Sequence, residues 1–89
     1  MNEMARLNVT WQGGNGDLPE AVPYDATDGD VKQMAMEAIR DGHIPGLRAG
    51  EANFTDYVVE RFPVEAGVRA APVIFLRAKT EYGESHETV

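Results

Sequence analysis

The residues of this chain that could take part in covalent chemistry lie near its carboxyl end. Residues 71–83, APVIFLRAKTEYG, begin with large apolar side chains, become basic at Arg77 and Lys79, and end at Gly83. Six polar residues, ESHETV, follow this glycine. The extension should bury almost nothing and add little stability, so the fold does not explain its presence. We therefore predict that residues 84–89 are removed by cleavage and that the Gly83 carboxylate is then used chemically.

Other residue types that carry chemistry are sparse. There is no cysteine, which excludes disulfides, a thiol nucleophile and cysteine-ligated metal. His43 and His86 are far apart and lack companions for a metal site or a catalytic pair, so we interpret both as solvated. The glycine cluster at residues 13–16 lacks the Lys-Ser/Thr pair of a phosphate-binding loop. We expect no catalytic residue, no metal site and no cofactor, and hence a protein that is not an enzyme.

Length and charge restrict the partners. Eighty-nine residues make one domain with a modest core, and 43% hydrophobic residues should allow it to fold. A formal net charge of −7 argues against nucleic acid and membrane surfaces and favours docking on a basic protein. No apolar segment has membrane-spanning length and the amino terminus has no signal-peptide pattern, so we predict a cytoplasmic protein.

The first half of the chain predicts a hairpin followed by a helix. Residues 5–12 alternate apolar and polar side chains, as a half-buried strand does. Glycines and an asparagine at residues 13–16 predict the turn, and residues 18–24 the returning edge strand. Thr27 or Asp28 can cap a helix over residues 30–41 that stops at Gly42. Its apolar face, predicted to pack on the first strand, consists of Val31, Met34, Ala35, Ala38 and Ile39.

The second half predicts a loop at residues 43–52, a strand at 54–62 and a central last strand. The last strand contains the unbroken apolar run Val73, Ile74, Phe75 and Leu76, which is typical of a strand with both faces in use. Only one of those faces can pack under the helix. We therefore predict that either Val73 and Phe75 or Ile74 and Leu76 face outward, in a partly exposed apolar patch that binds a protein partner.

This order predicts an α+β domain over residues 1–83, with a mixed four- to five-stranded sheet and one helix across one face. A last strand beside the first is the β-grasp arrangement. The chain resembles bacterial ubiquitin-like modifiers in the order NVTWQGGNG, DATDGDVKQMAMEAIRDG and VIFLRAKTEYG. Such modifiers accompany E1-like activating enzymes, E2-like conjugating proteins and JAB-type metallopeptidases. The resemblance departs at Tyr82, because many of these proteins and the related sulfur carriers end in Gly-Gly.

The resemblance implies that an E1-like enzyme uses ATP to activate Gly83, which is then joined to target proteins. Glycine suits such activation because it has no Cβ to obstruct attack at its carbonyl. Arg77, Lys79 and Tyr82 would guide the tail, and Lys32 or Lys79 could accept a further copy. We favour Lys32, as a lysine on the solvent face of a helix. A β-grasp interaction domain that is never conjugated, or a sulfur carrier, is the alternative.

Overall fold

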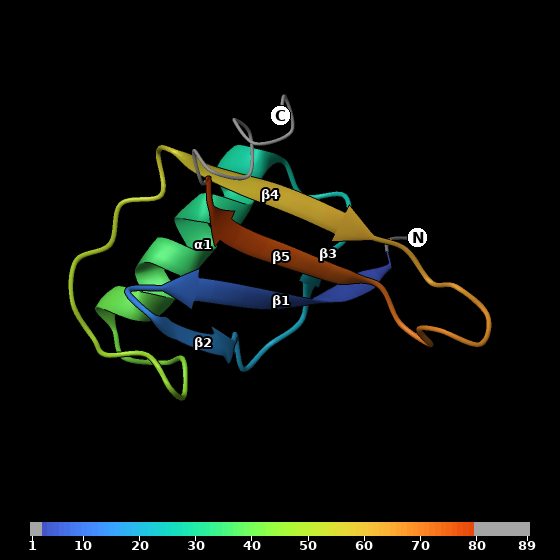
Figure 1. The fold of residues 1–89 in the computed structure, drawn as a ribbon, viewed down its shortest axis with the longest axis horizontal. Helices are drawn as coiled ribbons and strands as arrows, with labels where there is room; N and C mark the ends of the chain where they lie inside the picture. Colours follow the sequence, from blue (N-terminus) through green and yellow to red (C-terminus); the bar gives the residue numbers. More distant parts are fainter. Residues whose placement is uncertain (1–2, 80–89) are drawn as a thin grey trace, which may run out of the picture.

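A mixed sheet and one helix make up the described part of this computed structural model, which is residues 3–79 (Figure 1). In chain order the elements are β1 (Met4–Trp11), β2 (Gly14–Asp17), β3 (Val22–Pro23), α1 (Asp28–Arg40), β4 (Tyr57–Phe62) and β5 (Val73–Ala78). The strand order is β2-β1-β5-β4, and the short β3 pairs with the start of β1. β1 and β5 are parallel, whereas β2, β3 and β4 join the sheet antiparallel. This is the ubiquitin-like β-grasp topology, so the predicted fold class is confirmed.

The hairpin turn differs in part from the prediction, because only Gly13 of the cluster at residues 13–16 lies in the turn and the other three residues belong to β2. The turn consists of Gln12 and Gly13, both at positive φ (51° and 81°), as a two-residue turn between twisted strands requires. Gly14 and Gly16 belong to β2, and the loop after α1 lies directly against them. A Cβ on Gly16 would overlap the Pro45 carbonyl oxygen. Of residues 18–24, which we predicted as the second strand, only Val22 and Pro23 form a strand.

The helix agrees closely with the sequence. It begins at Asp28, two residues before the predicted start, with Thr27 as N-cap: the Thr27 hydroxyl accepts the Asp30 N–H at 3.1 Å. Gly42 has φ 71° and donates its N–H to the Ile39 carbonyl at 3.0 Å, the left-handed ending expected of a glycine there. α1 is not long and apolar enough to cross a membrane.

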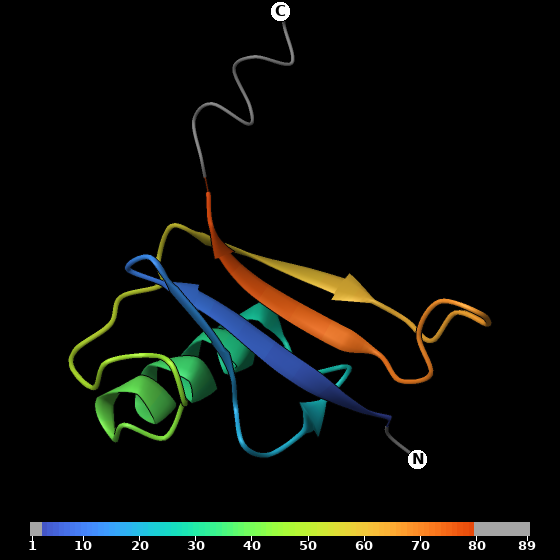
Figure 2. The same cartoon turned by 60° about the horizontal axis from the view of Figure 1, so that its bottom comes forward.

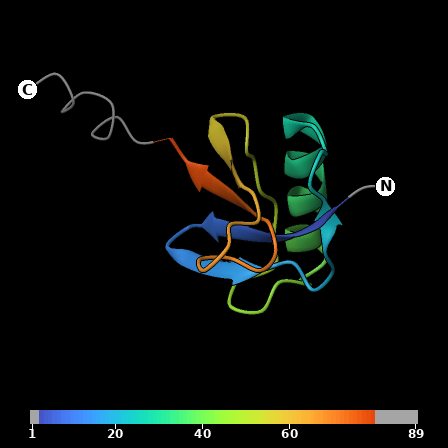
Figure 3. The same ribbon diagram turned by 90° about the vertical axis from the view of Figure 1, so that its right-hand side faces the viewer.

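The core lies between α1 and one face of the sheet (Figure 3). Four of the five predicted helix residues are buried and Met34 is half-buried. Ile44 and Phe54, from the segment between α1 and β4, also enter the core, which the sequence did not indicate. The buried side chains of the sheet and helix are Ala5, Leu7, Val9, Val22, Val31, Ala35, Ala38, Ile39, Ile74 and Leu76.

Arg61 connects the β4 edge of the sheet to the start of the helix. Its guanidinium, on β4, forms an ion pair with Asp28 at 2.8 Å and donates a hydrogen bond to the Ala26 carbonyl at 2.6 Å. β4 itself begins at Tyr57, three residues later than predicted. The ion pair and hydrogen bond hold α1 against the β4 side of the sheet.

Candidate functional site

The open face of the sheet, opposite α1, is the surface best suited to contact another molecule. No element of residues 3–79 is layered over it (Figures 2 and 3). Strand pairing sets its composition, because residues opposite one another across a ladder share a face. Leu7 and Val9 are buried beneath α1, so their strand neighbours point the other way. The open face thus carries Arg6, Asn8, Thr10, Asn15, Asp17, Val58, Glu60, Phe62, Val73, Phe75 and Arg77.

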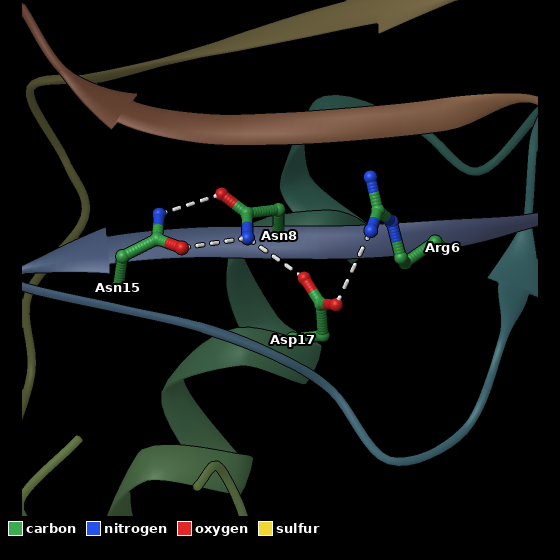
Figure 4. A network of polar contacts seen from close by, with 4 residues as sticks. All are labelled: Arg6, Asn8, Asn15 and Asp17. Atoms are coloured by element: carbon green, nitrogen blue, oxygen red, sulfur yellow. Dashed lines mark hydrogen bonds and ion pairs between the residues drawn. The ribbon is translucent and has the colours of Figure 1, made fainter. Parts of the chain in front are cut away.

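One half of the open face, on β1 and β2, is a connected set of polar side chains (Figure 4). Asn8 and Asn15 exchange two amide hydrogen bonds, of 3.0 Å and 2.7 Å. Asn8 also donates to Asp17 at 2.7 Å, and Asn15 donates to the Thr10 hydroxyl at 3.0 Å. Arg6 completes the set through an ion pair with Asp17 at 3.5 Å. These groups hydrogen-bond or ion-pair with one another across the two strands, so this half of the open face is a continuous polar surface.

The other half of the open face, on β4 and β5, is aromatic. Phe62 and Phe75 meet edge to face, with ring centroids 5.4 Å apart. The Arg77 guanidinium lies 4.4 Å from the Phe75 centroid and that of Arg69 lies 5.3 Å from the Phe62 centroid. Cation–π attraction of this kind favours a guanidinium group that lies over the face of the ring. The two arginines therefore shield the rings, and both phenylalanines are half-buried.

The predicted patch of four residues is divided between the two faces. Ile74 and Leu76 face α1 and are fully buried, so Val73 and Phe75 are the outward pair. Val73 lies opposite Phe62 and is only 4% exposed, which leaves Phe75 as the accessible member. Val58, 39% exposed on β4, extends this apolar area. The sequence did not indicate Val58 or Phe62, because their orientation depends on the register of β4 against β5.

The residues predicted for tail guidance begin where β5 ends. Arg77 is exposed, and its side chain turns back to Glu60 at 3.5 Å as well as to Phe75. Lys79 is exposed at the end of the described chain. Tyr82, Gly83 and residues 84–89 lie outside the described residues. The sheet therefore positions the strand that precedes Gly83 in sequence. The role of Gly83 as the conjugated residue remains a prediction.

Lys32, the favoured acceptor, is more constrained than a lysine on the solvent face of a helix. Its side chain is half-buried and its ammonium donates to the Thr55 carbonyl at 3.4 Å. We favoured Lys32 over Lys79 because we expected its side chain to move freely in solvent. The hydrogen bond and the partial burial restrict that side chain. An incoming acyl group would have to displace this contact before it met the amine.

An aromatic cluster lies where β1 ends and β4 begins. Trp11 and Phe54 meet with centroids 5.2 Å apart, and Phe54 and Tyr57 at 4.8 Å. Burial raises the pKa of the Tyr57 hydroxyl above its ordinary value. In residues 3–79 no three His, Cys, Asp or Glu side chains gather where they could hold a metal ion.

Comparison with known proteins adds no family to this geometry: no protein-family model, characterised protein or solved structure matches the chain. What is established is therefore the fold, a ubiquitin-like β-grasp topology.

Proposed function

We propose that this chain is a ubiquitin-like protein modifier of the cytoplasm, matured by cleavage after Gly83 and conjugated through that glycine. It is then not an enzyme but a protein substrate of an activating enzyme. The observation that carries the proposal is the position of β5. This strand lies in the middle of the sheet, between parallel β1 and antiparallel β4, and its carboxyl end leads toward Gly83. A tail that follows such a strand can be pulled or threaded without opening the core.

The maximal length of the segment between Lys79 and Gly83 also supports conjugation through Gly83. Gly83 follows Lys79 by four residues, which extend to at most about 14 Å. In this proposal, four residues of that maximal length would be long enough for the glycine carboxylate to enter the active site of another protein. Side chains at the end of β5 are held back on the sheet, since Arg77 contacts Phe75 and Glu60. The end of the strand that precedes the predicted tail is therefore held on the sheet.

The chemistry follows from the glycine. Before cleavage, the peptide bond to Glu84 blocks the Gly83 carboxylate, and a JAB-type metallopeptidase would hydrolyse that bond. The freed carboxylate attacks the α-phosphate of ATP and releases pyrophosphate. A thiolate of the E1-like enzyme then displaces AMP, an E2-like protein takes over the thioester, and a target amine displaces the thiol to form an amide.

Intact mass spectrometry of the protein purified from its native host tests this proposal. The expected species ends at Gly83, and deletion of a neighbouring peptidase gene should leave residues 84–89 in place. ATP–pyrophosphate exchange by the cognate activating enzyme should require the processed form. A Gly83→Ala chain truncated after residue 83 is the matched control and should exchange much more slowly, because its Cβ crowds the carbonyl.

A second function, an interaction domain that is never conjugated, is supported by the open face. Phe75, Phe62 and Val58 give it an apolar area, and the asparagine network beside them gives it polar groups. If the protein in its host always ends at Val89, and Gly83→Ala is fully active, conjugation is excluded. A Phe75→Ala variant should then lose partners that the wild-type protein retains.

A further inference from the structure

A groove runs between α1 and the segment of residues 18–26 that precedes the helix. It consists of two adjoining hollows, of about 390 Å³ and 440 Å³, which share Pro23 and Met34 in their linings. The helix residues that line it recur three or four positions apart, so they form one stripe along α1. This stripe extends from Asp30 to Asp41, which is about 17 Å at the rise of an α-helix.

The floor of the groove is apolar. Leu18, Val22 and Pro23 line it from the segment between β2 and α1, and Met34 and Ala38 line it from the helix. Val22 and Ala38 are buried in the core, whereas Leu18 and Met34 are only half-buried. Apolar side chains of a partner that cover this floor would remove further apolar area from water, which favours binding.

The rim of the groove is acidic on both walls. Its carboxylates are all exposed and come from both the helix and the segment before it: Glu20, Asp25, Asp30, Glu37 and Asp41. Among the described residues that line the groove, His43 is the only one with a basic side chain. Within residues 3–79 no three acidic or histidine side chains gather where they could hold a metal ion, so the carboxylates are spread along the groove.

Two arginines beside the groove are already paired. Arg40 forms an ion pair with Asp41 at 3.4 Å, and Arg61, which donates to the Ala26 carbonyl, forms one with Asp28 at 2.8 Å. Setting Asp41 aside leaves four carboxylates that make the groove negative, in a chain whose formal net charge is −7. This charge argues against a second copy of the chain as the occupant and favours a basic partner.

Neither wall offers the continuous row of backbone groups that an added strand needs. In the segment between β2 and α1, Pro19 and Pro23 have no N–H, and the N–H groups of Leu18, Tyr24 and Ala26 donate within the domain. The opposite wall is a helix, whose backbone groups bond along its own axis. An occupant whose backbone groups are also paired internally, an α-helix, suits such a groove.

We propose that this groove binds a basic amphipathic helix of a partner protein. Apolar side chains on one stripe of that helix lie on Leu18 and Met34, and lysines or arginines on its two flanks face the carboxylates of the two walls. A groove of about 17 Å accommodates about eleven residues, or three turns. The binding uses neither Gly83 nor the open face, so it holds whether or not the chain is conjugated.

Methyl NMR with a defined peptide tests the proposal. The probe is a terminally blocked peptide of about fourteen residues, in which leucines form one helical stripe, lysines flank it on both sides and alanines fill the rest. The protein carries isotope-labelled methionine methyl groups. Met34 lies in the groove, whereas Met36 lines the hollows on the opposite side of α1 and is the internal control. The Met34 signal should shift as peptide is added and the Met36 signal should not. Shifts of both, or of neither, overturn the proposal.

Matched charge reversals separate docking in the groove from general attraction to an acidic protein. Glu20→Lys and Glu37→Lys, one on each wall, should each weaken peptide binding at least about 5-fold in isothermal titration calorimetry. Glu51→Lys makes the same change in net charge on the opposite side of α1 and should weaken it less than about 2-fold. All three side chains are exposed, so the variants should fold. Equal losses in the three variants overturn the proposal.

Further comparisons address the floor and the chemistry of the occupant. Met34→Gln should weaken binding at least about 5-fold, and Met36→Gln, the same change outside the groove, less than about 2-fold. A peptide with proline in its central turn should bind more weakly, because it cannot remain helical there. Equal binding of the proline peptide overturns the helical occupant. Equal binding of a peptide with glutamates in place of its lysines overturns the basic one.

Discussion

Gly16 shows how the lack of a side chain can determine where a loop lies. A Cβ at this position would overlap the Pro45 carbonyl oxygen and approach Ile44 Cγ2 to 2.7 Å. We expect Gly16→Ala to lower the free energy of unfolding by about 1–3 kcal/mol, the usual cost of overpacking. Urea denaturation followed by circular dichroism measures the change.

Gly29→Ala is the control for that substitution. A Cβ at Gly29, in the first turn of α1, would meet only the Thr27 hydroxyl oxygen at 3.9 Å. Alanine should therefore raise the stability there, by up to about 1 kcal/mol, because it is the better helix former. If Gly16→Ala were equally harmless, the close approach of residues 44–47 to β2 would be wrong.

Tyr57 links stability to alkaline pH. Burial raises the pKa of its hydroxyl, so the folded protein holds this proton more tightly than the unfolded chain does. Stability from this group is complete below the unfolded pKa of about 10 and is lost as pH rises through the folded value. Tyr57→Phe should reduce the fall in melting temperature between about pH 9 and pH 11. An unchanged pH profile would show that Tyr57 ionises as freely in the folded protein as in the unfolded chain.

At the scale of elements, α1 could be predicted because its signals are local. Thr27 caps the helix, Gly42 ends it, and the apolar stripe lies between them. β2 could not be predicted, because its glycines are explained by residues 44–47, about thirty positions away in sequence. The sequence also left open which face of β5 is exposed, since that depends on the register with β1 and β4.

Packing of α1 on the sheet provides a direct test of the helix face. Ile39 is 1% exposed in the core, and Ile39→Ala should lower the free energy of unfolding by about 2–5 kcal/mol. Gln33→Ala, on the exposed side of the same helix, should change it by no more than about 0.5 kcal/mol. Similar values for the two variants would place the wrong face of α1 against the sheet.

At the scale of the whole molecule, the core of the described residues 3–79 can be compared with the length of the chain. Its buried residues extend from Ala5 to Leu76. We therefore expect truncation after Lys79 to shift the melting temperature by less than about 2 °C, which corresponds to well under 1 kcal/mol for a domain of this size. Differential scanning calorimetry of the full and truncated chains measures the shift. A larger loss would mean that residues 80–89 contribute to the fold.

Charge is distributed unevenly between the two sides of the domain. The three arginines on or beside the open face pair with carboxylates: Arg6 with Asp17, Arg69 with Glu65 and Arg77 with Glu60. Further acidic residues that contribute to the net charge of −7 lie elsewhere in the chain, with Asp30 and Glu37 on α1 among them. The basic partner expected from the net charge remains a prediction.

Parallel pairing of β1 with β5 also dictates when the protein can fold. The first strand finds its central neighbour only in residues 73–76, near the far end of the chain. During synthesis, Leu7 and Val9 therefore remain without their β5 partners until Ile74 and Leu76 have been made. Contacts so distant in sequence must close a long loop first, which slows folding. The domain should consequently complete its sheet only after residues 73–76 have emerged, and its amino-terminal strand is open to aggregation until then.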